Sequence, residues 1–321
     1  MLRLNVLIAT HGRTRLLERT LDSLVETSRP AGFEHIHVIE NGSDAGAADI
    51  CRRAKLKLPV EYRHEQQAGK ARALQRMIEQ LGGGLVVFLD DDVRVSPQLF
   101  DSYARAADAE GGGCFYGGPL LIDYEKPPPD WLAGRLPVSA AGWQPNDPDN
   151  PFEGQNSRFL GANYGVMVET LLGVGGLHGG LGPGAMRPGC EGNPSGEETE
   201  LQDRLIAAGV RPKYLPEARV WHYVPRQRAT PRWALGRHYR NRMFRAMIEP
   251  QPSGKRLWFD VPVDLWRQLF ALGLTAMFAN FHPSPRARFE RRLPYYRLRG
   301  YIHGLRVRAG MNVESIRPAT R

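Results

Sequence analysis

Cysteine is scarce in this 321-residue sequence, and no two of its cysteines have the spacing of metal ligands. The three are Cys51, Cys114 and Cys190. A small, odd number of cysteines argues against a disulfide-stapled scaffold and fits a reducing compartment. The first residues, MLRLNVLIATHGR, contain one apolar run of strand length and no small-residue cleavage site, so a signal peptide is not expected. Together these absences predict a cytoplasmic protein.

Long hydrophobic runs are also missing. Within DLWRQLFALGLTAMFANF (residues 264–281), the uncharged part covers only residues 268–281, which is shorter than the roughly 20 residues of a membrane-spanning helix. This segment either packs on the domain as a helix or lies in a membrane interface, because the basic and aromatic stretch that follows suits an interfacial helix. Nucleic-acid binding is not expected, since no recognition motif accompanies the basic residues.

Acidic residues are rare in the last hundred positions. Residues 222–321 contain 20 Lys or Arg and 5 Asp or Glu, a balance of +15, and the whole chain carries +9, so the rest carries about −6 by subtraction. The basic segment is either a solvated surface or one attracted to anionic membranes or phosphate-bearing substrates. We predict one domain at 1–235, with halves at 1–110 and 111–235. Residues 236–321 would form a basic, mainly helical extension that could sit peripherally on the inner face of the membrane.

Segments with strand patterns alternate with helical patterns four times in the first hundred residues. The expected strands cover residues 4–9, 33–39, 60–63 and 85–89. This alternation predicts right-handed βαβ units, and therefore an α/β fold with a mostly parallel sheet. Residues 174–196 are rich in Gly and Pro and predict a loop, followed by a helix from Glu197 or Glu198 and a strand ending at His222.

Polar residues follow three of the expected strands, where ligands of parallel sheets collect. They are Thr10, His11, Gly12 and Arg13 after the first strand, Glu40, Asn41 and Gly42 after the second, and Asp90, Asp91 and Asp92 after the fourth. Gly69 and Lys70 open the intervening helix, whose free backbone amides favour an anion, and Arg72 adds positive charge. Cations and carboxylates thus meet at one edge, as binding of a metal-bound phosphate ester requires.

Two pairs of carboxylates are candidates for catalysis. Asp90 and Asp92 are one residue apart, so both can face Mg²⁺ or Mn²⁺ together with substrate phosphates, although they could also cap a helix or solvate a loop. Glu197 and Glu198 lie directly after the Gly- and Pro-rich loop, where either can be a general base. Acidic residues in a first helical turn also simply complement the helix dipole.

Seven short motifs, in order, resemble those of the inverting family-2 glycosyltransferases with the GT-A fold. They are ATHGR, VIENGSDA, QQAGKARALQ, FLDDDV, GANYGVMVETLLGVGG, GEETEL and VWHYV. The resemblance covers about residues 4–235. It implies a mostly parallel nucleotide-binding sheet flanked by helices, a mixed acceptor-side region and a helical C-terminal extension. It also implies inverting transfer of a sugar from a nucleotide-diphosphate sugar to a hydroxyl of a glycan, lipid-linked sugar or small molecule, with Mn²⁺ or Mg²⁺ as cofactor.

The resemblance assigns roles to individual residues. The donor would contact Thr10, Arg13, Glu40, Gly69, Lys70, Arg72, Asp90 and Asp91, of which Asp91 could instead only orient the loop. The metal ligands would be Asp90, Asp92 and His222, the base Glu198 or its neighbour Glu197, and the acceptor-side residues Gly161, Asn163 and Trp233. RATPRW resembles the QxxRW motif of processive synthases but has Ala229 in place of Gln, which favours single-sugar transfer with Arg228, Arg232 and Trp233 as a gate.

Two other functions are compatible with parts of the pattern. Glu replaces the family's Asp at positions 40 and 198, which leaves open a non-catalytic relative that binds sugar nucleotides or glycans. A sugar-1-phosphate nucleotidyltransferase would need a Gly-rich basic loop after the first strand, where ATHGRTR has one glycine. A dehydrogenase would need GxGxxG at that place, which is absent.

Overall fold

The computed structural model describes residues 1–152, 158–179, 196–248 and 256–309. The chain forms two compact units. Among the described residues, the N-terminal unit comprises 1–123, 142–179 and 196–223, and the C-terminal unit comprises 124–141 and the residues from 224 onward.

The N-terminal unit is built on a seven-stranded sheet in the order β3-β2-β1-β4-β8-β6-β9. The strands are β1 (Leu4–Thr10), β2 (Phe33–Asn41), β3 (Val60–Glu65), β4 (Leu85–Asp90), β6 (Cys114–Gly117), β8 (Asn163–Met167) and β9 (Arg211–Tyr214). The first four are mutually parallel, β8 is antiparallel to both β4 and β6, and β9 is parallel to β6. The predicted α/β fold with a mostly parallel sheet is confirmed.

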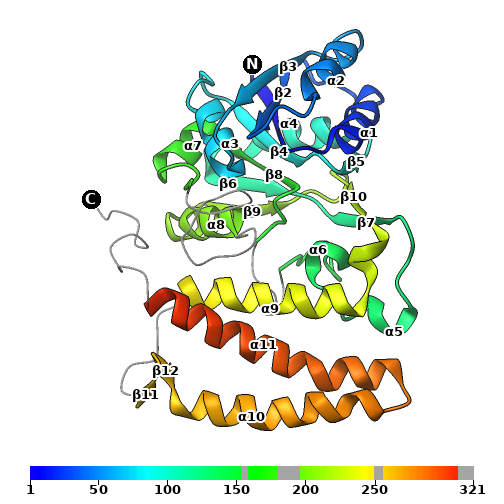
Figure 1. Cartoon of the computed structure of the whole chain (residues 1–321). Coiled ribbons are helices and arrows are strands. Elements are labelled where there is room, and N and C mark those ends of the chain that lie inside the picture. Colours follow the sequence, from blue (N-terminus) through cyan, green and yellow to red (C-terminus); the bar gives the residue numbers. More distant parts are fainter. Residues whose placement is uncertain (153–157, 180–195, 249–255, 310–321) are drawn as a thin grey trace. The chain divides into compact units, whose positions relative to one another are not determined.

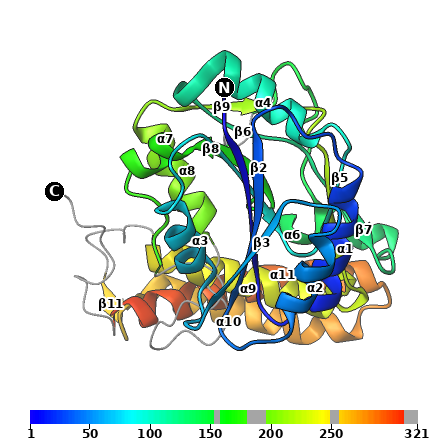
Figure 2. The same cartoon turned by 90° about the horizontal axis from the view of Figure 1, so that it is seen from above.

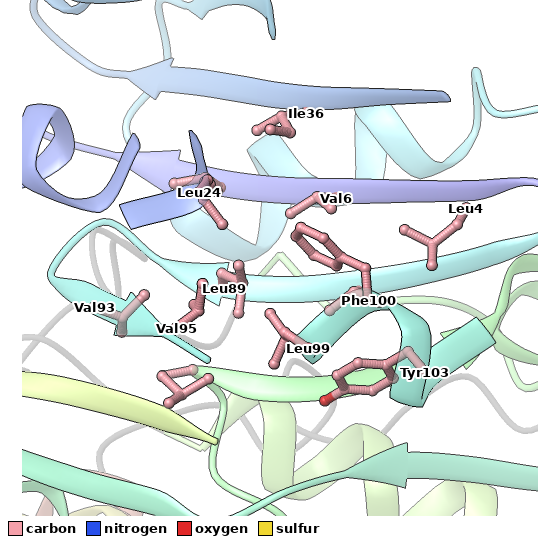
Figure 3. Close-up of a cluster of buried hydrophobic side chains, with 14 of the residues drawn as sticks. Leu4, Val6, Leu24, Ile36, Leu89, Val93, Val95, Leu99, Phe100 and Tyr103 are labelled. Atoms are coloured by element: carbon pink, nitrogen blue, oxygen red, sulfur yellow. The ribbon is translucent and has the colours of Figure 1, made fainter. Parts of the chain in front are cut away.

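Helices cover both faces of this sheet (Figures 1 and 2). One core contains side chains of α1 (Thr14–Val25), α2 (Ala47–Ala54) and α4 (Leu99–Glu110), and the other contains those of α3 (Lys70–Ile78), α7 (Val168–Gly173) and α8 (Glu197–Ala207). Because both faces are covered, β1 is buried at every position, which explains its continuous apolar sequence. Figure 3 shows the first core, where Val6 and Leu89 of the sheet lie near Phe100 of α4.

A second, three-stranded sheet was not predicted. Its order is β5-β10-β7, with β5 (Val93–Val95), β10 (Val220–Val224) and β7 (Leu120–Tyr124). The run CFYGGPLLI reads as one strand in the sequence, but the chain leaves the large sheet at Gly118, where an added Cβ would lie 2.1 Å from the Ala218 carbonyl oxygen. The 3-10 turn η1 (Gly111–Gly113) precedes β6. The small sheet matters for the site, because it pairs His222 with Val93.

The C-terminal unit is mainly helical. It contains α5 (Asp130–Ala133), α6 (Val138–Ala141), η2 (Arg226–Ala229), α9 (Pro231–Ile248), β11 (Leu257–Trp258), β12 (Val261–Pro262), α10 (Val263–Phe278), η3 (Ala279–Phe281) and α11 (Pro285–Ala309). The long helix α11 contacts both α9 and α10 (Figure 1). Gly300 and Gly304 allow its close approach to α9, since a Cβ on either would lie 2.1 Å from a backbone oxygen of Tyr239 or Met243. Among the helices that the structure describes, none is both long and apolar enough to cross a membrane.

Candidate active site

The ends of β1, β2 and β4 bring the predicted polar residues to one edge of the sheet. In the parallel register Thr10 lies opposite Glu40, and Ala9 lies opposite Asp90. Residues that directly follow these strands therefore share this edge, as expected for the carboxyl ends of neighbouring parallel strands.

Asp91 is held inside the protein by Thr10, the last residue of β1, and by Arg13, which follows the strand. It accepts a hydrogen bond from the Thr10 hydroxyl at 2.7 Å, and its other oxygen lies 3.1 Å from Arg13 Nη1. Burial raises the pKa of Asp91 to about 6, against the opposing effect of the Arg13 charge. For Arg13, burial lowers the pKa, but the charges of Asp91, Asp92 and Asp90 outweigh this and raise it. These contacts fix the turn between β4 and β5.

Asp92 lies between Arg13 and His222. Its Oδ2 accepts a hydrogen bond from Arg13 Nη1 at 2.9 Å, and its Oδ1 lies 3.3 Å from His222 Nε2. Both Asp92 and His222 are buried. The strand pair β5–β10 creates this proximity, since it aligns His222 with the residue that follows Asp92.

The donor atoms of Asp92 and His222 suit a divalent cation, but they do not form a complete metal cage. No group of three or more His, Cys, Asp or Glu side chains in the described segments is arranged to hold a metal. The third predicted ligand, Asp90, instead binds Lys70 Nζ through its Oδ1. Mg²⁺ and Mn²⁺ commonly use one or two protein ligands together with substrate phosphates, so the pair fits a site that the donor completes.

Lys70 connects Asp90 to the second carboxylate pair. Its Nζ is 3.9 Å from Glu197 Oε1 in addition to its contact with Asp90. Burial lowers the pKa of Lys70, but the charges of Asp90, Glu197 and Glu198 outweigh this and raise it. Lys70 is therefore a permanent positive charge at the N-terminus of α3, where backbone amides also favour an anion.

Glu197 and Glu198 begin α8, as predicted. Glu197 is buried, and one of its oxygens accepts a hydrogen bond from the Gly196 amide at 3.1 Å. Burial and the charge of the neighbouring Glu197 raise the pKa of Glu198, Lys70 opposes them, and the resulting pKa is about 8. A carboxylate whose pKa lies near neutral pH is a stronger proton acceptor than an exposed one, which is the property of a general base.

Gly161, one of the predicted acceptor-side residues, lies against Glu198. A Cβ added at Gly161 would be 3.1 Å from Glu198 Cγ and 3.2 Å from its Cδ. We expect Gly161→Ala to displace this carboxylate and to lower the transfer rate about tenfold, since small misplacements of a reacting group are costly. Donor affinity should stay unchanged, because Gly161 is not among the donor-side residues.

Steady-state kinetics measure this effect as a lower kcat without a change in donor KM. Gly134→Ala is the matched control, because nothing lies within 4 Å of a Cβ at that position. Equal kcat values for Gly161→Ala and Gly134→Ala would contradict the assigned position of the base.

Asn41 is one of the polar residues that follow the expected second strand, but the sequence assigned no role to it. Its Nδ2 donates to the Thr10 carbonyl at 2.9 Å, and its Oδ1 accepts from the Gly69 amide at 3.0 Å. One side chain thus ties the ends of β1 and β2 to the start of α3. Gly69 has φ +143°, which favours glycine at this junction. In the sequence, the signal for such a connecting side chain is an Asn at a strand end that is followed by a glycine. The glycine here, Gly42, has φ +90°.

Two predicted residues use their polar groups inside the protein. Glu40 is fully buried and accepts hydrogen bonds from the Ala45 amide at 2.9 Å and from the Tyr62 hydroxyl at 2.7 Å, so it holds the turn after β2. Asn163 accepts from the Tyr103 hydroxyl at 2.8 Å and donates to backbone oxygens of Pro119 and Ala218. Neither side chain enters the site that we propose below.

The remaining predicted residues are outside this network. Arg72 is half-buried on α3 near Gly179. Trp233 and Arg232 belong to the C-terminal unit, where they line a groove of about 420 Å³ with Gln227, Thr230, Gly236 and Arg240. Arg228, the third residue of the predicted gate, does not line this groove, and a gate over the diphosphate stays a prediction. Cys190 and most of the Gly- and Pro-rich loop lie outside the described residues.

Comparison with known proteins relates the chain to glycosyltransferases. Residues 5–160, just under half of the chain, match the model of glycosyl transferase family 2. The chain is similar to this family over that segment. It is 32% identical over 127 residues to validoxylamine A glucosyltransferase from Streptomyces hygroscopicus subsp. limoneus, covering 36% of this chain and 27% of the relative. It is 24% identical over 248 residues to the succinoglycan biosynthesis protein ExoM from Rhizobium meliloti (strain 1021), covering 75% of this chain and 73% of the relative.

Solved structures share the fold of this chain. One is the mannosyltransferase PcManGT from Pyrobaculum calidifontis, in complex with GDP-Man and Mn²⁺, which has a TM-score of 0.55 at 19% identity. The match covers 94% of this chain and 86% of the PcManGT chain. Another is GalNAc-T7 with UDP, GalNAc and Mn²⁺, which has a TM-score of 0.52 at 14% identity. The match covers 79% of this chain and 52% of the GalNAc-T7 chain. The predicted GT-A type fold is confirmed, as is the prediction that the protein is a glycosyltransferase.

Proposed function

We propose that this glycosyltransferase moves a sugar from a nucleotide-diphosphate sugar to a hydroxyl acceptor, with inversion and with a divalent metal. The observation that carries the proposal is the juxtaposition around Lys70. This cation contacts Asp90 at the strand end and approaches Glu197, next to a partly buried Glu198 whose pKa is raised to about 8. A donor-binding charge and a proton acceptor therefore share one site.

The donor diphosphate would bind at the N-terminus of α3. Lys70 and Arg72 would supply positive charge there, and the backbone amides of the first helical turn favour an anion. Asn41 fixes this helix start relative to β1 and β2. The solved relatives named above contain GDP-Man or UDP, which supports a nucleotide-sugar donor.

Asp92 and His222 would hold the metal together with oxygens of the diphosphate. Bound there, Mn²⁺ or Mg²⁺ would neutralise negative charge on the leaving group. Arg13 and the β5–β10 pairing keep the two protein ligands in place. Both solved relatives named above carry Mn²⁺, which supports the choice of metal.

Glu198 would act as the base for the acceptor hydroxyl. As the acceptor oxygen attacks the anomeric carbon, its proton passes to the Glu198 carboxylate while the bond from that carbon to the diphosphate breaks. Attack from the face opposite the leaving group inverts the anomeric configuration. Gly161 leaves room for this carboxylate, and Glu197 together with burial raises its basicity.

The acceptor would be a growing glycan, a lipid-linked sugar or a small molecule in the synthesis of cell-surface polysaccharide or glycolipid. The similarity to a succinoglycan biosynthesis protein along 75% of the chain supports this setting. The altered QxxRW pattern at 228–233 favours single-sugar transfer.

A donor screen tests the proposed function. We expect one of UDP, GDP, dTDP and CMP to raise the melting temperature of the protein in Mn²⁺, because a ligand that binds only the folded state stabilises it. EDTA should abolish most of this shift, and the matching nucleotide sugar should be consumed only with metal present. A chain that binds a nucleotide sugar tightly but never turns it over, with any hydroxyl acceptor offered, would instead be the non-catalytic relative.

A further inference from the structure

The helix α10 has apolar side chains that pack against α11 and other large apolar side chains that are not covered. Leu265, Trp266 and Leu269 pack against a cluster that contains Ile302 and Leu305 of α11. No residue of α10 is fully buried. The uncovered apolar side chains face solvent.

These side chains form one stripe along the helix. The apolar stripe consists of Phe270, Leu274, Met277, Phe278 and Phe281. Their spacing of four, three, one and three residues places them on one side of a helix. Phe270 is 72% exposed and Phe281 is 82% exposed. A contiguous exposed apolar surface of this kind marks an interaction site, because isolated surface residues do not line up by chance along three turns.

A second group of exposed apolar residues lies at the start of α10. The hairpin of β11 and β12 presents Leu257, Trp258 and Phe259 to solvent, and the Trp266 indole of α10 donates to the Trp258 carbonyl at 2.9 Å. Phe259 has φ +48°, in the left-handed region where Gly or Asn is usual. The Phe259 ring packs against Trp258, with ring centroids 5.1 Å apart, and both side chains remain exposed, so this aromatic pair is open to a contact outside the chain.

The charge around the apolar stripe indicates which kind of partner could bind it. Residues 265–289 contain no Asp or Glu, and Arg267, Arg286 and Arg288 lie within or next to this segment. Arg267 precedes Phe270 by three residues, so it lies on the side of the stripe, and it is exposed. Two copies of the chain joined through this surface would bring two strongly basic segments together, which charge repulsion opposes.

We propose that α10 and the β11–β12 hairpin dock on the surface of an anionic lipid bilayer. The apolar stripe and the hairpin aromatics would enter the headgroup region, while Arg267 and the basic residues of α11 contact lipid phosphates. Such a helix lies in the plane of the interface, consistent with the absence of a helix that could cross a membrane in the described residues. This binding is independent of sugar transfer and does not rest on the proposed function.

Vesicle sedimentation with the full chain tests the proposal. Vesicles of phosphatidylcholine with about one third phosphatidylglycerol should bind the protein, and vesicles of pure phosphatidylcholine should bind it at least about tenfold more weakly. High salt should weaken binding to the anionic vesicles, because it screens the attraction. Phe270→Glu combined with Phe278→Glu should lower the partition coefficient about a hundredfold, or about tenfold for each aromatic removed.

The matched control is Leu56→Glu, which places the same charge at an 87% exposed leucine outside the C-terminal unit and should bind vesicles like the wild type. Circular dichroism and the nucleotide-induced thermal shift check that the double variant is folded. Equal binding to neutral and anionic vesicles would overturn the proposal. So would unchanged binding by the double variant, or a dimer in gel filtration that the double variant splits, which would identify a second copy as the occupant.

Discussion

Glu198→Gln is expected to lower the transfer rate by about three orders of magnitude while donor binding persists. General-base catalysis contributes roughly 10²–10⁴-fold, and the amide has the shape of the carboxyl group without its proton affinity. Single-turnover assays with the metal-bound donor measure the rate, and nucleotide titration measures binding. Glu200→Gln is the control, since Glu200 belongs to the same helical turn and binds Arg204 instead of the site.

The outcome also distinguishes the two adjacent glutamates. If Glu198→Gln remains active and Glu197→Gln does not, Glu197 is the base. For the wild type, kcat/KM should rise with pH through the Glu198 pKa of about 8, because only the ionised carboxylate accepts the proton. A rate that is flat between pH 6 and about 9 would contradict a base with this pKa.

The same substitution should stabilise the fold at neutral pH. Burial raises the folded-state pKa of Glu198 from 4.5 to about 8, so the wild type keeps a proton that the unfolded chain releases above pH 4.5. This costs stability increasingly from about pH 4.5 to pH 8, on the order of 1–3 kcal/mol at neutral pH, and the amide avoids the cost. Melting curves should show no gain for Glu198→Gln below pH 4.5 and a growing gain up to about pH 8.

Asp92→Ala is expected to remove most of the metal-dependent part of nucleotide binding. Asp92 would supply one of two protein ligands, and losing even an outer-shell partner commonly costs 10–100-fold in metal affinity, so we expect about 100-fold or more. The readout is the ratio of nucleotide affinities measured with Mn²⁺ and with EDTA, which a general loss of stability does not change.

Two further variants serve as comparisons for Asp92→Ala. Asp49→Ala removes an exposed carboxylate of α2 and should leave the ratio unchanged. Asp92→Asn keeps a group that can accept the Arg13 hydrogen bond but lacks the charge, so it should bind metal as poorly as the alanine variant. An unchanged Mn²⁺ effect in both Asp92 variants would exclude this residue as a ligand.

The parts of the fold that sequence reasoning predicted are those with complete local patterns. The strands β1 and β4 are buried apolar runs followed by polar residues, and such runs identify central parallel strands directly. The small sheet was missed because β5 has three residues and because β6 and β7 read as one strand across Gly117 and Gly118. Pairing between short strands depends on distant partners that a local pattern does not contain.

For the site, the sequence identified many of the residues but not the groups that they contact in the folded chain. The spacing of Asp90 and Asp92 suggests that both face one cation, but Asp90 ends a strand and turns to Lys70, while Asp92 lies in the following turn beside Arg13 and His222. The buried roles of Glu40 and Asn41 depend on Tyr62 and Gly69, which come from other elements. Such contacts follow from the folded chain and not from residue type.

The pairing of β5 with β10 determines when the site can form during synthesis of the chain. Residues 5–160, the segment that carries the family match, contain Asp92 and Lys70 but neither His222 nor Glu198. During synthesis from the N-terminus, the nascent chain can form the first four strands long before the strand that carries His222 leaves the ribosome. With the proposed roles of Glu198 and His222, the complete site can form only after residue 222 has been synthesised, so chains that end before this residue are expected to lack transfer activity.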